Sequence, residues 1–331
     1  MADPRVRWGV MGTANIGRVA VIPALQAARN CTVTAVASRS GKTAAGFARQ
    51  MGIPQAYGSY EALLQADDVD AVYIPLPNSL HREWVIRAAE AGKHILCEKP
   101  LGLTAQECLE MASEAEARRV LLMEAFMYRF HPRTEKVLEI VGSGVLGPLR
   151  LIHAAFTFRL ADPANIRWQP NLGGGALMDV GCYCVNICRT AAQEEPTEVQ
   201  AVARWAGSGV DDQMVATLRF PSGLLAQFDC ALSMERREVY QVAGAEAHLE
   251  VPAAFLPGKS DTAIYERHGQ GAPKVHPIAG ADQYQRMVEH FADSILLRRP
   301  VRYGPAEAAA NMRTIEALYR SSRQGGLPVA V

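Results

Sequence analysis

The stretch that decides the fold is RWGVMGTANIG, residues 7–17. It continues an apolar run of strand length and carries Gly12 and Gly17, the first and third glycines of the pattern G-x-G-x-x-G. Ala14 stands where the second glycine lets the backbone approach a pyrophosphate closely. The stretch predicts a strand-to-helix turn whose helix N-terminus offers N–H groups to a phosphate. A tight turn that merely holds two glycines is the alternative.

The first half of the chain alternates short strands and helices. Several of the strands are apolar on both faces, as expected of parallel strands covered by helices. The expected strands are VRWGVM, TVTAVAS, DAVYIPLP, HILCE and VLLME, and the expected helices cover 15–28, 42–51, 60–65, 79–91 and 105–118. This alternation predicts an α/β fold over residues 1–127, a doubly wound parallel sheet of the Rossmann type.

The second half changes pattern. Strands follow one another closely from residue 149 to residue 252, with turn signals such as PSG and AGA between them, which favours an antiparallel sheet. Helices are expected at 133–141, 176–191, 283–297 and 305–322. We therefore predict an α+β domain over residues 128–331.

The composition limits the class of protein. The chain has 331 residues, enough for two domains, and 34 basic residues balance 34 acidic ones. No basic block is present that would neutralise a row of phosphates, which argues against nucleic acid as a partner. The segment MADPRVRWG lacks the apolar core of a signal peptide, and no apolar run is long enough to span a membrane. We expect a cytoplasmic protein with no membrane contact.

The seven cysteines are scattered, and only CYCVNIC clusters three of them. A zinc site needs a fourth ligand and paired C-x-x-C spacing, which this cluster lacks. We predict reduced, buried thiols and no metal.

The end of the second strand indicates which dinucleotide the turn would bind. An acidic side chain about 20 residues after the glycines accepts the ribose hydroxyls of NAD, but here the strand ends in Ser38 and Arg39, with Lys42 nearby. A guanidinium binds a 2′-phosphate with two hydrogen bonds, and a serine hydroxyl assists it. We predict NADP(H) rather than NAD(H), the alternative being a solvated basic turn.

Two further stretches carry candidate chemistry. CEKPLG, residues 97–102, follows a strand of the parallel sheet, at the edge where ligands of such sheets gather, so Lys99 could meet a substrate oxygen. NIRWQPNLGGGALMDVGCYCVN, residues 165–186, has three glycines that would leave N–H groups free at a helix start. Asp179 and Tyr183 share a helix face there, which suits proton transfer beside a lysine. A surface loop and a structural hydrogen bond are the alternatives.

Together the motifs resemble the glucose–fructose oxidoreductase/inositol dehydrogenase (Gfo/Idh/MocA) family. The matching segments, in order, are GTANIG, VASRS, YIPLPNSLHREWVIRAAEAGKHILCEKPLG, EAFMYRFHP and NIRWQPNLGGGALMDVGCY. The resemblance implies an N-terminal Rossmann domain and a C-terminal domain whose open sheet often forms an oligomer interface. Many members have a histidine four residues beyond the aspartate. Tyr183 at that position is similar to the branch with dimeric dihydrodiol dehydrogenase, NADP-dependent xylose dehydrogenases and sugar ketoreductases, where a tyrosine takes the histidine's role.

The resemblance also implies site residues. The catalytic set is Lys99, Asp179 and Tyr183. The cofactor-binding set is Gly12, Thr13, Ala14, Asn15, Ile16, Ser38, Arg39, Leu76, Asn78, His81, Glu98, Lys99, Arg167 and Trp168. Arg129, Phe158 and Tyr284 are candidates for the substrate pocket, and His81 has the alternative of a satisfied histidine at a helix start.

The implied activity is hydride transfer between NADP(H) and an aldose, cyclic polyol or keto-sugar, with Tyr183 as acid/base. The alternatives are a glycoside hydrolase that retains NAD, a dehydrogenase of non-sugar trans-dihydrodiols, and a non-catalytic regulator that binds NADPH. We expect a homodimer or homotetramer formed through the C-terminal sheet.

Overall fold

The computed structural model describes residues 4–331, so the first three residues of the predicted first domain lie outside the described part. The chain forms two compact units. The first comprises the chain up to Phe130 together with Asp282–Ala309, and the second comprises His131–Ala281 together with Ala310–Val331.

The first unit is built on a six-stranded parallel sheet in the order β3-β2-β1-β4-β5-β6. This is the strand order of a dinucleotide-binding Rossmann domain, with the order reversing between β1 and β4. The strands are β1 (Val6–Met11), β2 (Cys31–Ala37), β3 (Gln55–Tyr57), β4 (Ala71–Ile74), β5 (His94–Cys97) and β6 (Leu122–Glu124). Nearly every residue of β1, β4 and β5 is buried, which explains their uninterrupted apolar runs.

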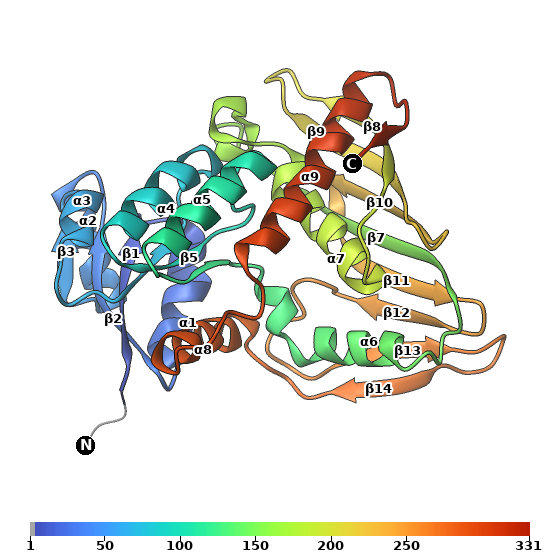
Figure 1. The fold of residues 1–331 in the computed structure, drawn as a ribbon, viewed down its shortest axis with the longest axis horizontal. Coiled ribbons are helices and arrows are strands. Elements are labelled where there is room, and N and C mark those ends of the chain that lie inside the picture. Colours follow the sequence, from blue (N-terminus) through green and yellow to red (C-terminus); the bar gives the residue numbers. More distant parts are fainter. Residues whose placement is uncertain (1–3) are drawn as a thin grey trace. The chain divides into compact units, whose positions relative to one another are not determined.

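Helices connect these strands, and α4 and α5 lie side by side (Figure 1). The helical segments are η1 (Gly17–Val21), α1 (Ile22–Ala27), α2 (Gly41–Met51), α3 (Tyr60–Leu64), η2 (Asn78–Leu80), α4 (His81–Glu90), α5 (Ala105–Ala117), η3 (Met127–Phe130), α8 (Gln283–Leu296) and the start of α9 (Pro305–Arg323). Ser40, Ser59 and Thr104 accept hydrogen bonds from the first turns of α2, α3 and α5, which defines where each helix begins.

Helix α8 corrects the predicted division of the chain, which assigned everything after residue 127 to one domain. Its buried side chains, among them Met287, Val288 and Phe291, pack against α1, η1, β1 and β2 of the first unit. Phe291 lies against Trp8 of β1, with ring centroids 5.6 Å apart. An amphipathic pattern shows which face of a helix is buried but not which sheet covers it.

The second unit is built on a nine-stranded sheet in the order β14-β13-β12-β11-β7-β10-β9-β8-β15. All its strand pairs are antiparallel except β7 with β10, so the predicted, mainly antiparallel α+β arrangement is confirmed. The strands are β7 (Leu149–Arg159), β8 (Glu198–Trp205), β9 (Asp211–Arg219), β10 (Leu225–Ala231), β11 (Ser233–Gly244), β12 (His248–Pro252), β13 (Thr262–Arg267), β14 (Lys274–Ile278) and β15 (Val329–Ala330).

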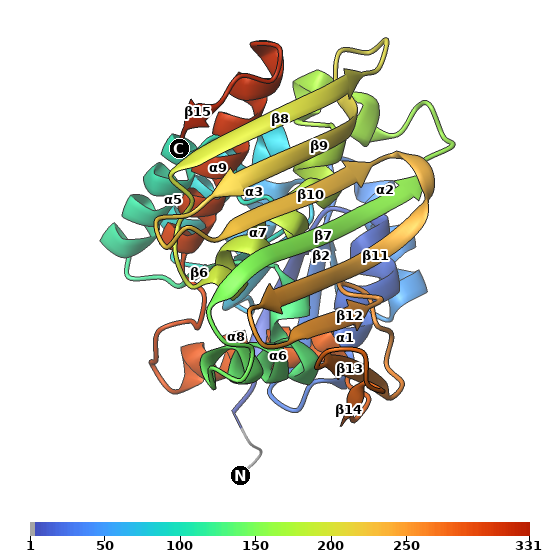
Figure 2. The same ribbon diagram turned by 90° about the vertical axis from the view of Figure 1, so that its right-hand side faces the viewer.

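Helices of this unit lie on one side of the sheet. They are α6 (Pro132–Gly142), η4 (Ile166–Trp168), η5 (Pro170–Leu172), η6 (Leu177–Gly181), α7 (Cys182–Ala192) and the rest of α9. Figure 2 shows the sheet face-on, with α7 and α9 behind β7–β10 and, among the described residues, no helix in front of these strands. The side chains of Val202 and Val215, which are register partners in β8 and β9, are 64% and 52% exposed.

Among residues 4–331, no helix is both long enough and apolar enough to cross a membrane.

Candidate active site

The turn after β1 depends on a glycine with a positive φ. Gly12 has φ +112°, which favours glycine, and its N–H donates to the carbonyl of Ala37 at the end of β2, 2.8 Å away. A side chain on Gly12 would press on Leu76, at 3.2 Å, and would also lie 3.8 Å from the Tyr60 hydroxyl. Ala14, at the position of the missing second glycine, is half-buried.

The helix that follows begins with a widened turn. Ile16 precedes the π-helical segment Gly17–Val21, which continues directly into α1. Arg18 projects from this segment and donates to the Asn15 side chain, 2.5 Å away. Single π-helical turns are uncommon and frequently mark functional sites.

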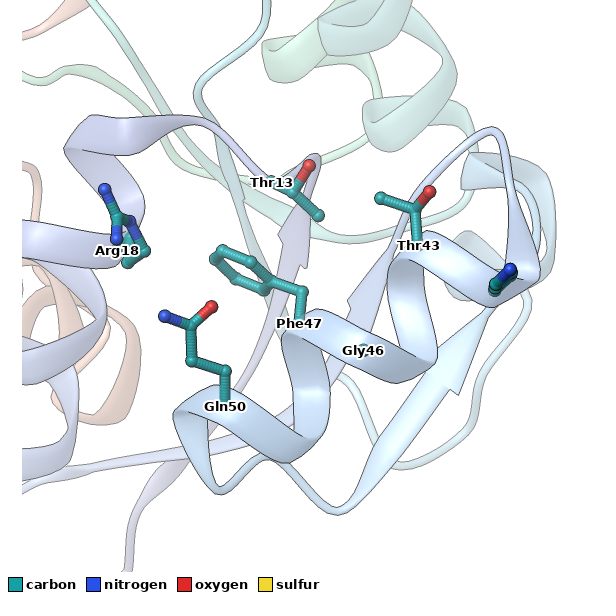
Figure 3. Close-up of a pocket in the computed structure, with 7 residues that line it drawn as sticks. Thr13, Arg18, Thr43, Gly46, Phe47 and Gln50 are labelled. Carbon is teal, nitrogen blue, oxygen red and sulfur yellow. The ribbon is translucent and has the colours of Figure 1, made fainter.

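An open pocket of about 400 Å³ lies between this turn and α2. Figure 3 shows Thr13 and Arg18 on one side of it and Thr43, Phe47 and Gln50 of α2 on the other. Lys42 and Gly46 complete the lining. Two cations and two hydroxyls around one concave surface suit a phosphorylated ligand.

Ser38 and Arg39 follow the C-terminal end of β2 and precede α2, the helix that lines the pocket. The Ser38 N–H donates to the Tyr57 carbonyl, 3.1 Å away, which ties the end of β2 to β3. Arg39 is exposed, and its charge acts on Tyr60, the residue whose hydroxyl lies near Gly12. Arg39 therefore lies on the same edge of the sheet as the glycine turn.

The loop that carries Lys99 is held by buried side chains from neighbouring strands and helices. Its Lys99–Pro100 peptide bond is cis. The Leu101 N–H donates to the Glu124 carboxylate, 2.7 Å away, and the Tyr73 hydroxyl donates to Glu98, 2.6 Å away. The backbone around Lys99 is thus anchored on both sides.

His81 fastens the same loop to the end of β4. Its Nδ1 lies 2.9 Å from the Pro100 carbonyl and its Nε2 lies 2.9 Å from the Leu76 carbonyl, and the side chain is fully buried. Burial lowers the pKa of the imidazole. These contacts correspond to the alternative of a satisfied histidine at a helix start. Asn78, on the turn before α4, is half-buried.

In the second unit, Asp179 lies in η6 and pairs with Arg167. The Arg167 Nε donates to Asp179 Oδ2, 2.6 Å away, and the Asp179 side chain is 13% exposed. Trp168 follows Arg167 in η4 and is half-buried. Arg167 and Asp179 both belong to the stretch 165–186 that the sequence analysis singled out, and the structure brings them into contact across 12 residues of sequence.

The glycine run corrects one prediction, that its N–H groups are free at the helix start. The Gly174 and Gly175 N–H groups donate to the carbonyls of Gln169 and Arg167, and the Leu177 N–H donates to Asp211 Oδ2, 2.7 Å away. A side chain on Gly175, whose φ is +120°, would collide with the Asp211 carboxylate. These glycines therefore accommodate close approach within the chain itself.

Tyr183, in the first turn of α7, belongs to a buried aromatic cluster. Its ring lies 5.4 Å from that of Phe156 and 5.3 Å from that of Phe255, and these two phenylalanines are stacked with centroids 5.1 Å apart. The side chain of Tyr183 is 5% exposed. Rigid aromatic neighbours restrict the phenol ring to few orientations.

The three candidates for the substrate pocket lie in different settings. Arg129 is 5% exposed, pairs with Glu307 at 3.1 Å and stacks over the Tyr303 ring, so its charge is used inside the first unit. Phe158 in β7 is half-buried. Tyr284 in α8 is half-buried and acts electrostatically on Tyr73, so it belongs to the first unit.

All seven cysteines are free and buried, as the sequence predicts. Burial raises the pKa of Cys188 to about 12, so this thiol stays protonated at neutral pH. In the part of the chain that the structure describes, no three His, Cys, Asp or Glu side chains form a cluster suited to a metal ion.

Sequence reasoning missed several residues that shape these sites. Arg18 and Tyr60 come from segments read only as helix, and no local motif marks them. Glu124 begins the segment EAFMYRFHP, but nothing in that segment indicates its contact with the Leu101 N–H. Asp211 lies 34 residues from Leu177 along the chain, so its contact with the glycine run has no local signal.

The sheet order, the Gly12 turn and the basic pocket define the class of protein, an enzyme fold that binds a dinucleotide. The chain belongs to the oxidoreductase family with an NAD-binding Rossmann fold, Gfo/Idh/MocA, whose model matches residues 6–126. The model of the Gfo/Idh/MocA C-terminal domain matches residues 134–250. The predicted family, Rossmann fold and oxidoreductase class are confirmed.

The chain is 40% identical over 319 residues to a D-xylose 1-dehydrogenase (NADP(+)) of Haloferax volcanii, covering 96% of this chain and 98% of that protein. It is 34% identical over 256 residues to the trans-1,2-dihydrobenzene-1,2-diol dehydrogenase of Mus musculus, covering 76% of each. Its fold matches KijD10, a 3-ketoreductase from Actinomadura kijaniata solved with NADP and TDP-benzene, with a TM-score of 0.91, 31% identity and coverage of 96% and 98%. The predicted branch of the family is thus confirmed, and both the named dehydrogenase and the solved reductase agree with the predicted cofactor, NADP(H).

Proposed function

We propose that this chain is an NADP(H)-dependent oxidoreductase that transfers hydride between the nicotinamide and a carbohydrate-type alcohol or carbonyl, such as an aldose, cyclic polyol or keto-sugar. The observation that carries the proposal is the 40% identity, over nearly the full length of both chains, to a protein named as an NADP-dependent xylose dehydrogenase. The basic character of the pocket beside the glycine turn agrees with it.

The residues around the turn fit a dinucleotide phosphate. The conformation of Gly12 and the helix start at Gly17 suit a pyrophosphate near Thr13, Ala14, Asn15 and Ile16. Ser38 and Arg39 suit the 2′-phosphate that distinguishes NADP from NAD, and Arg18 and Lys42 add positive charge to the pocket beside the glycine turn. Ala14 adds one methyl group at the position of the second glycine, which would hold the pyrophosphate slightly further from the backbone.

The remaining proposed cofactor residues act in different ways. His81 and Leu76 contribute by holding the Lys99 loop, since both ring nitrogens of His81 already face carbonyls. Glu98 is held by the Tyr73 hydroxyl. We also propose that the cofactor lies close to Asn78, Arg167 and Trp168. Arg167 pairs with Asp179 as well.

The proposed chemistry of the chain is proton transfer. When bound, the nicotinamide supplies the hydride acceptor or donor. Tyr183 takes the hydroxyl proton in the oxidation direction and returns it in reduction. Lys99 lowers the phenol pKa and stabilises a developing alkoxide, and Asp179, fixed by Arg167, maintains the geometry. Phe158 and Tyr284 remain candidates for substrate contact. Arg129 is a weaker one, because Glu307 and Tyr303 already engage its guanidinium.

The first experiment measures net NADPH formation from NADP⁺ with D-xylose and a panel of aldoses and polyols. The panel includes trans-1,2-dihydrobenzene-1,2-diol, because the mouse relative bears that name. Net NADPH with a sugar supports the proposal, and turnover of the diol alone favours the dihydrodiol alternative. A retained cofactor with glycoside cleavage and no net NADPH would indicate the hydrolase alternative. Binding without turnover on the whole panel would indicate a regulator.

The second experiment tests the assigned residues. Tyr183→Phe and Lys99→Ala are expected to reduce kcat by about two to four orders of magnitude while the Kd for NADPH stays within a few-fold. Unchanged turnover in both variants would refute the assignment.

The proposal includes a homodimer or homotetramer formed through the face of the nine-stranded sheet that Figure 2 turns to the viewer. Its exposed apolar side chains include Leu151, Val202, Val215 and Leu225, which lie as two register pairs across β7–β10 and β8–β9. Exposed apolar side chains on a sheet face that no helix covers among the described residues are compatible with an association surface. Seven free thiols support the proposed cytoplasmic location, since such thiols persist in reducing compartments.

A further inference from the structure

A buried arginine holds the loop that follows β12. Arg133, near the start of α6, is 1% exposed. Its Nη1 donates to the Pro252 carbonyl at 2.8 Å and to the Thr262 hydroxyl at 3.0 Å. Its Nη2 donates to the carbonyls of Ala253 at 2.6 Å and Ala254 at 2.8 Å. One planar guanidinium therefore binds three consecutive backbone carbonyls, a pattern that its rigid fork of donors suits.

A buried carboxylate holds the other side of the same loop. Glu238 lies in β11, and its side chain is 5% exposed. Its carboxylate accepts the Leu256 N–H at 3.0 Å, and its backbone carbonyl accepts the Ala254 N–H at 3.1 Å. The charge of Glu238 also acts on Arg133. The arginine thus binds carbonyl oxygens of the loop 252–256, and the glutamate binds its N–H groups.

These contacts maintain an unusual backbone conformation. Ala253 has φ +45°, in the left-handed region that residues other than glycine rarely adopt. Such a conformation persists where the surrounding contacts over-determine it. The Ala253 carbonyl accepts the shortest of the four hydrogen bonds from Arg133. The turn at Ala253 leads to Phe255, whose side chain is fully buried.

Phe255 connects this loop to Tyr183. Its ring is stacked on Phe156, with centroids 5.1 Å apart, and lies 5.3 Å from the ring of Tyr183. Phe156 belongs to β7, a strand inside the nine-stranded sheet, so strand pairing on both sides fixes its position. Phe255 lies outside any strand or helix. Its position therefore depends on the contacts that hold the loop.

We propose that Arg133 is a positioning residue for Tyr183 and that it acts through Phe255. The guanidinium fixes the loop 252–256, the loop fixes the Phe255 ring, and that ring restricts the orientation of the phenol. The inference rests on the proposed function for the role of Tyr183 as acid/base. Arg133 affects proton transfer indirectly, because its guanidinium donates to four acceptors within the chain.

The first readout needs no substrate. Fluorotyrosine is incorporated in place of tyrosine, and the fluorine resonance of Tyr183 is identified by its absence in Tyr183→Phe. Because a nearby aromatic ring shifts such a resonance, it is expected to move in Phe255→Leu. It is also expected to move in Arg133→Lys, since an ammonium group does not match the four acceptors. The matched control is Phe220→Leu. Phe220 is 2% exposed in the same unit, and in the described part of the chain its ring does not contact that of Tyr183.

The second readout is turnover with NADP⁺ and the sugar that gives the highest activity on the panel, at a temperature where circular dichroism shows every variant folded. Phe255→Leu and Arg133→Lys are each expected to lower kcat about tenfold and to leave the KM for NADP⁺ within about twofold. The control Phe220→Leu is expected to keep kcat within about twofold of the wild type. In the double variant, kcat is expected to stay within about twofold of Phe255→Leu, because Arg133 has no further route to Tyr183 once the Phe255 ring is gone.

The outcomes separate this inference from the proposed function. A Tyr183 resonance that stays in place in Arg133→Lys, or that moves equally in Phe220→Leu, overturns the inference. A double variant whose loss in kcat is the product of the two single losses also overturns it. If Arg133→Lys does not fold, Thr262→Val takes its place, because it removes one of the four acceptors and is expected to move the resonance in the same direction. Absence of turnover in the wild type, with the shifts present, counts against the proposed function and leaves the contact through Phe255 standing.

Discussion

Gly175→Ala tests the structure of the second unit most directly, because the added methyl group destabilises the folded state in two independent ways. Gly175 has φ +120°, a conformation that costs an L-residue about 1–2 kcal/mol. The new Cβ would also lie 3.0 Å from the Tyr319 hydroxyl and still closer to Asp211 Oδ1. Real Cβ atoms do not approach so closely, so the carboxylate must move.

The magnitude follows from the contacts that this movement breaks. Asp211 accepts two hydrogen bonds, and each bond to a charged group contributes about 1.5–3 kcal/mol. Weakening of both, added to the backbone cost, gives a loss of about 4 kcal/mol in the free energy of unfolding. For a unit of this size the midpoint of thermal unfolding falls by roughly 10 °C.

The assay is thermal and urea unfolding without cofactor, with Gly46→Ala as the matched control. Gly46 lies inside α2, and a Cβ there meets nothing within 4 Å. Alanine is expected to stabilise that helix by about 0.5–1 kcal/mol, the opposite sign for the same chemical change. A loss below about 1 kcal/mol in Gly175→Ala would refute the argument, since the turn would then tolerate a side chain against Asp211.

Three further predictions concern charge and association. Burial raises the pKa of Asp211 to about 6, so protonation of this carboxylate stabilises the folded state relative to the unfolded state. This stabilisation is complete below about pH 4 and is lost as the pH rises through 6. Urea unfolding should therefore show Asp211→Asn gaining about 3 kcal/mol on the wild type between pH 4 and pH 8, and a constant difference would contradict the raised pKa. Arg39→Ala should raise the KM for NADP⁺ about 10- to 100-fold and leave the KM for NAD⁺ within about twofold, measured by steady-state kinetics; an equal rise for both cofactors would remove Arg39 from the 2′-phosphate site. Val215→Glu, on a side chain that is 52% exposed, should shift the mass measured by light scattering toward the monomer, and an unchanged oligomer would exclude this face as the interface.

Most strands of the Rossmann unit could be predicted because the residues of each strand show the apolar pattern of a buried parallel strand. Buried parallel strands are apolar on both faces, and right-handed connections restrict the order in which such strands lie. The strand that the prediction missed, β3, has only three residues, of which Gln55 and Ala56 are exposed. A strand this short and polar has no pattern to distinguish it from a loop.

The edge of the second sheet was missed for a similar reason. Strand β14 has the sequence KVHPI, in which Pro277 cannot donate to a ladder, and it lies at the end of the strand order. Edge strands are often polar or contain proline, which weakens the alternation that identifies a strand.

The motifs nominate residues for the candidate site, but they do not indicate the contacts between those residues. The motifs identified Lys99, Asp179 and Tyr183, yet none of them indicated that Arg167 binds Asp179 or that His81 holds the Lys99 loop. The contact between Tyr319 and Asp211 spans 108 residues of sequence. Contacts at that separation depend on the packing of the whole unit, which a local motif does not report.

The two widened helical turns show where local sequence stops being informative. Both η1 and η6 were expected to be ordinary α-helix, because one π-helical turn scarcely changes the spacing of apolar residues. Each of these segments contains a glycine, Gly17 in η1 and Gly181 in η6. At Gly181 the reason is steric, since a Cβ would lie 2.8 Å from both Cys230 Sγ and Leu177 Cδ1. The widened turn presses its backbone against β10, and the glycine permits that approach.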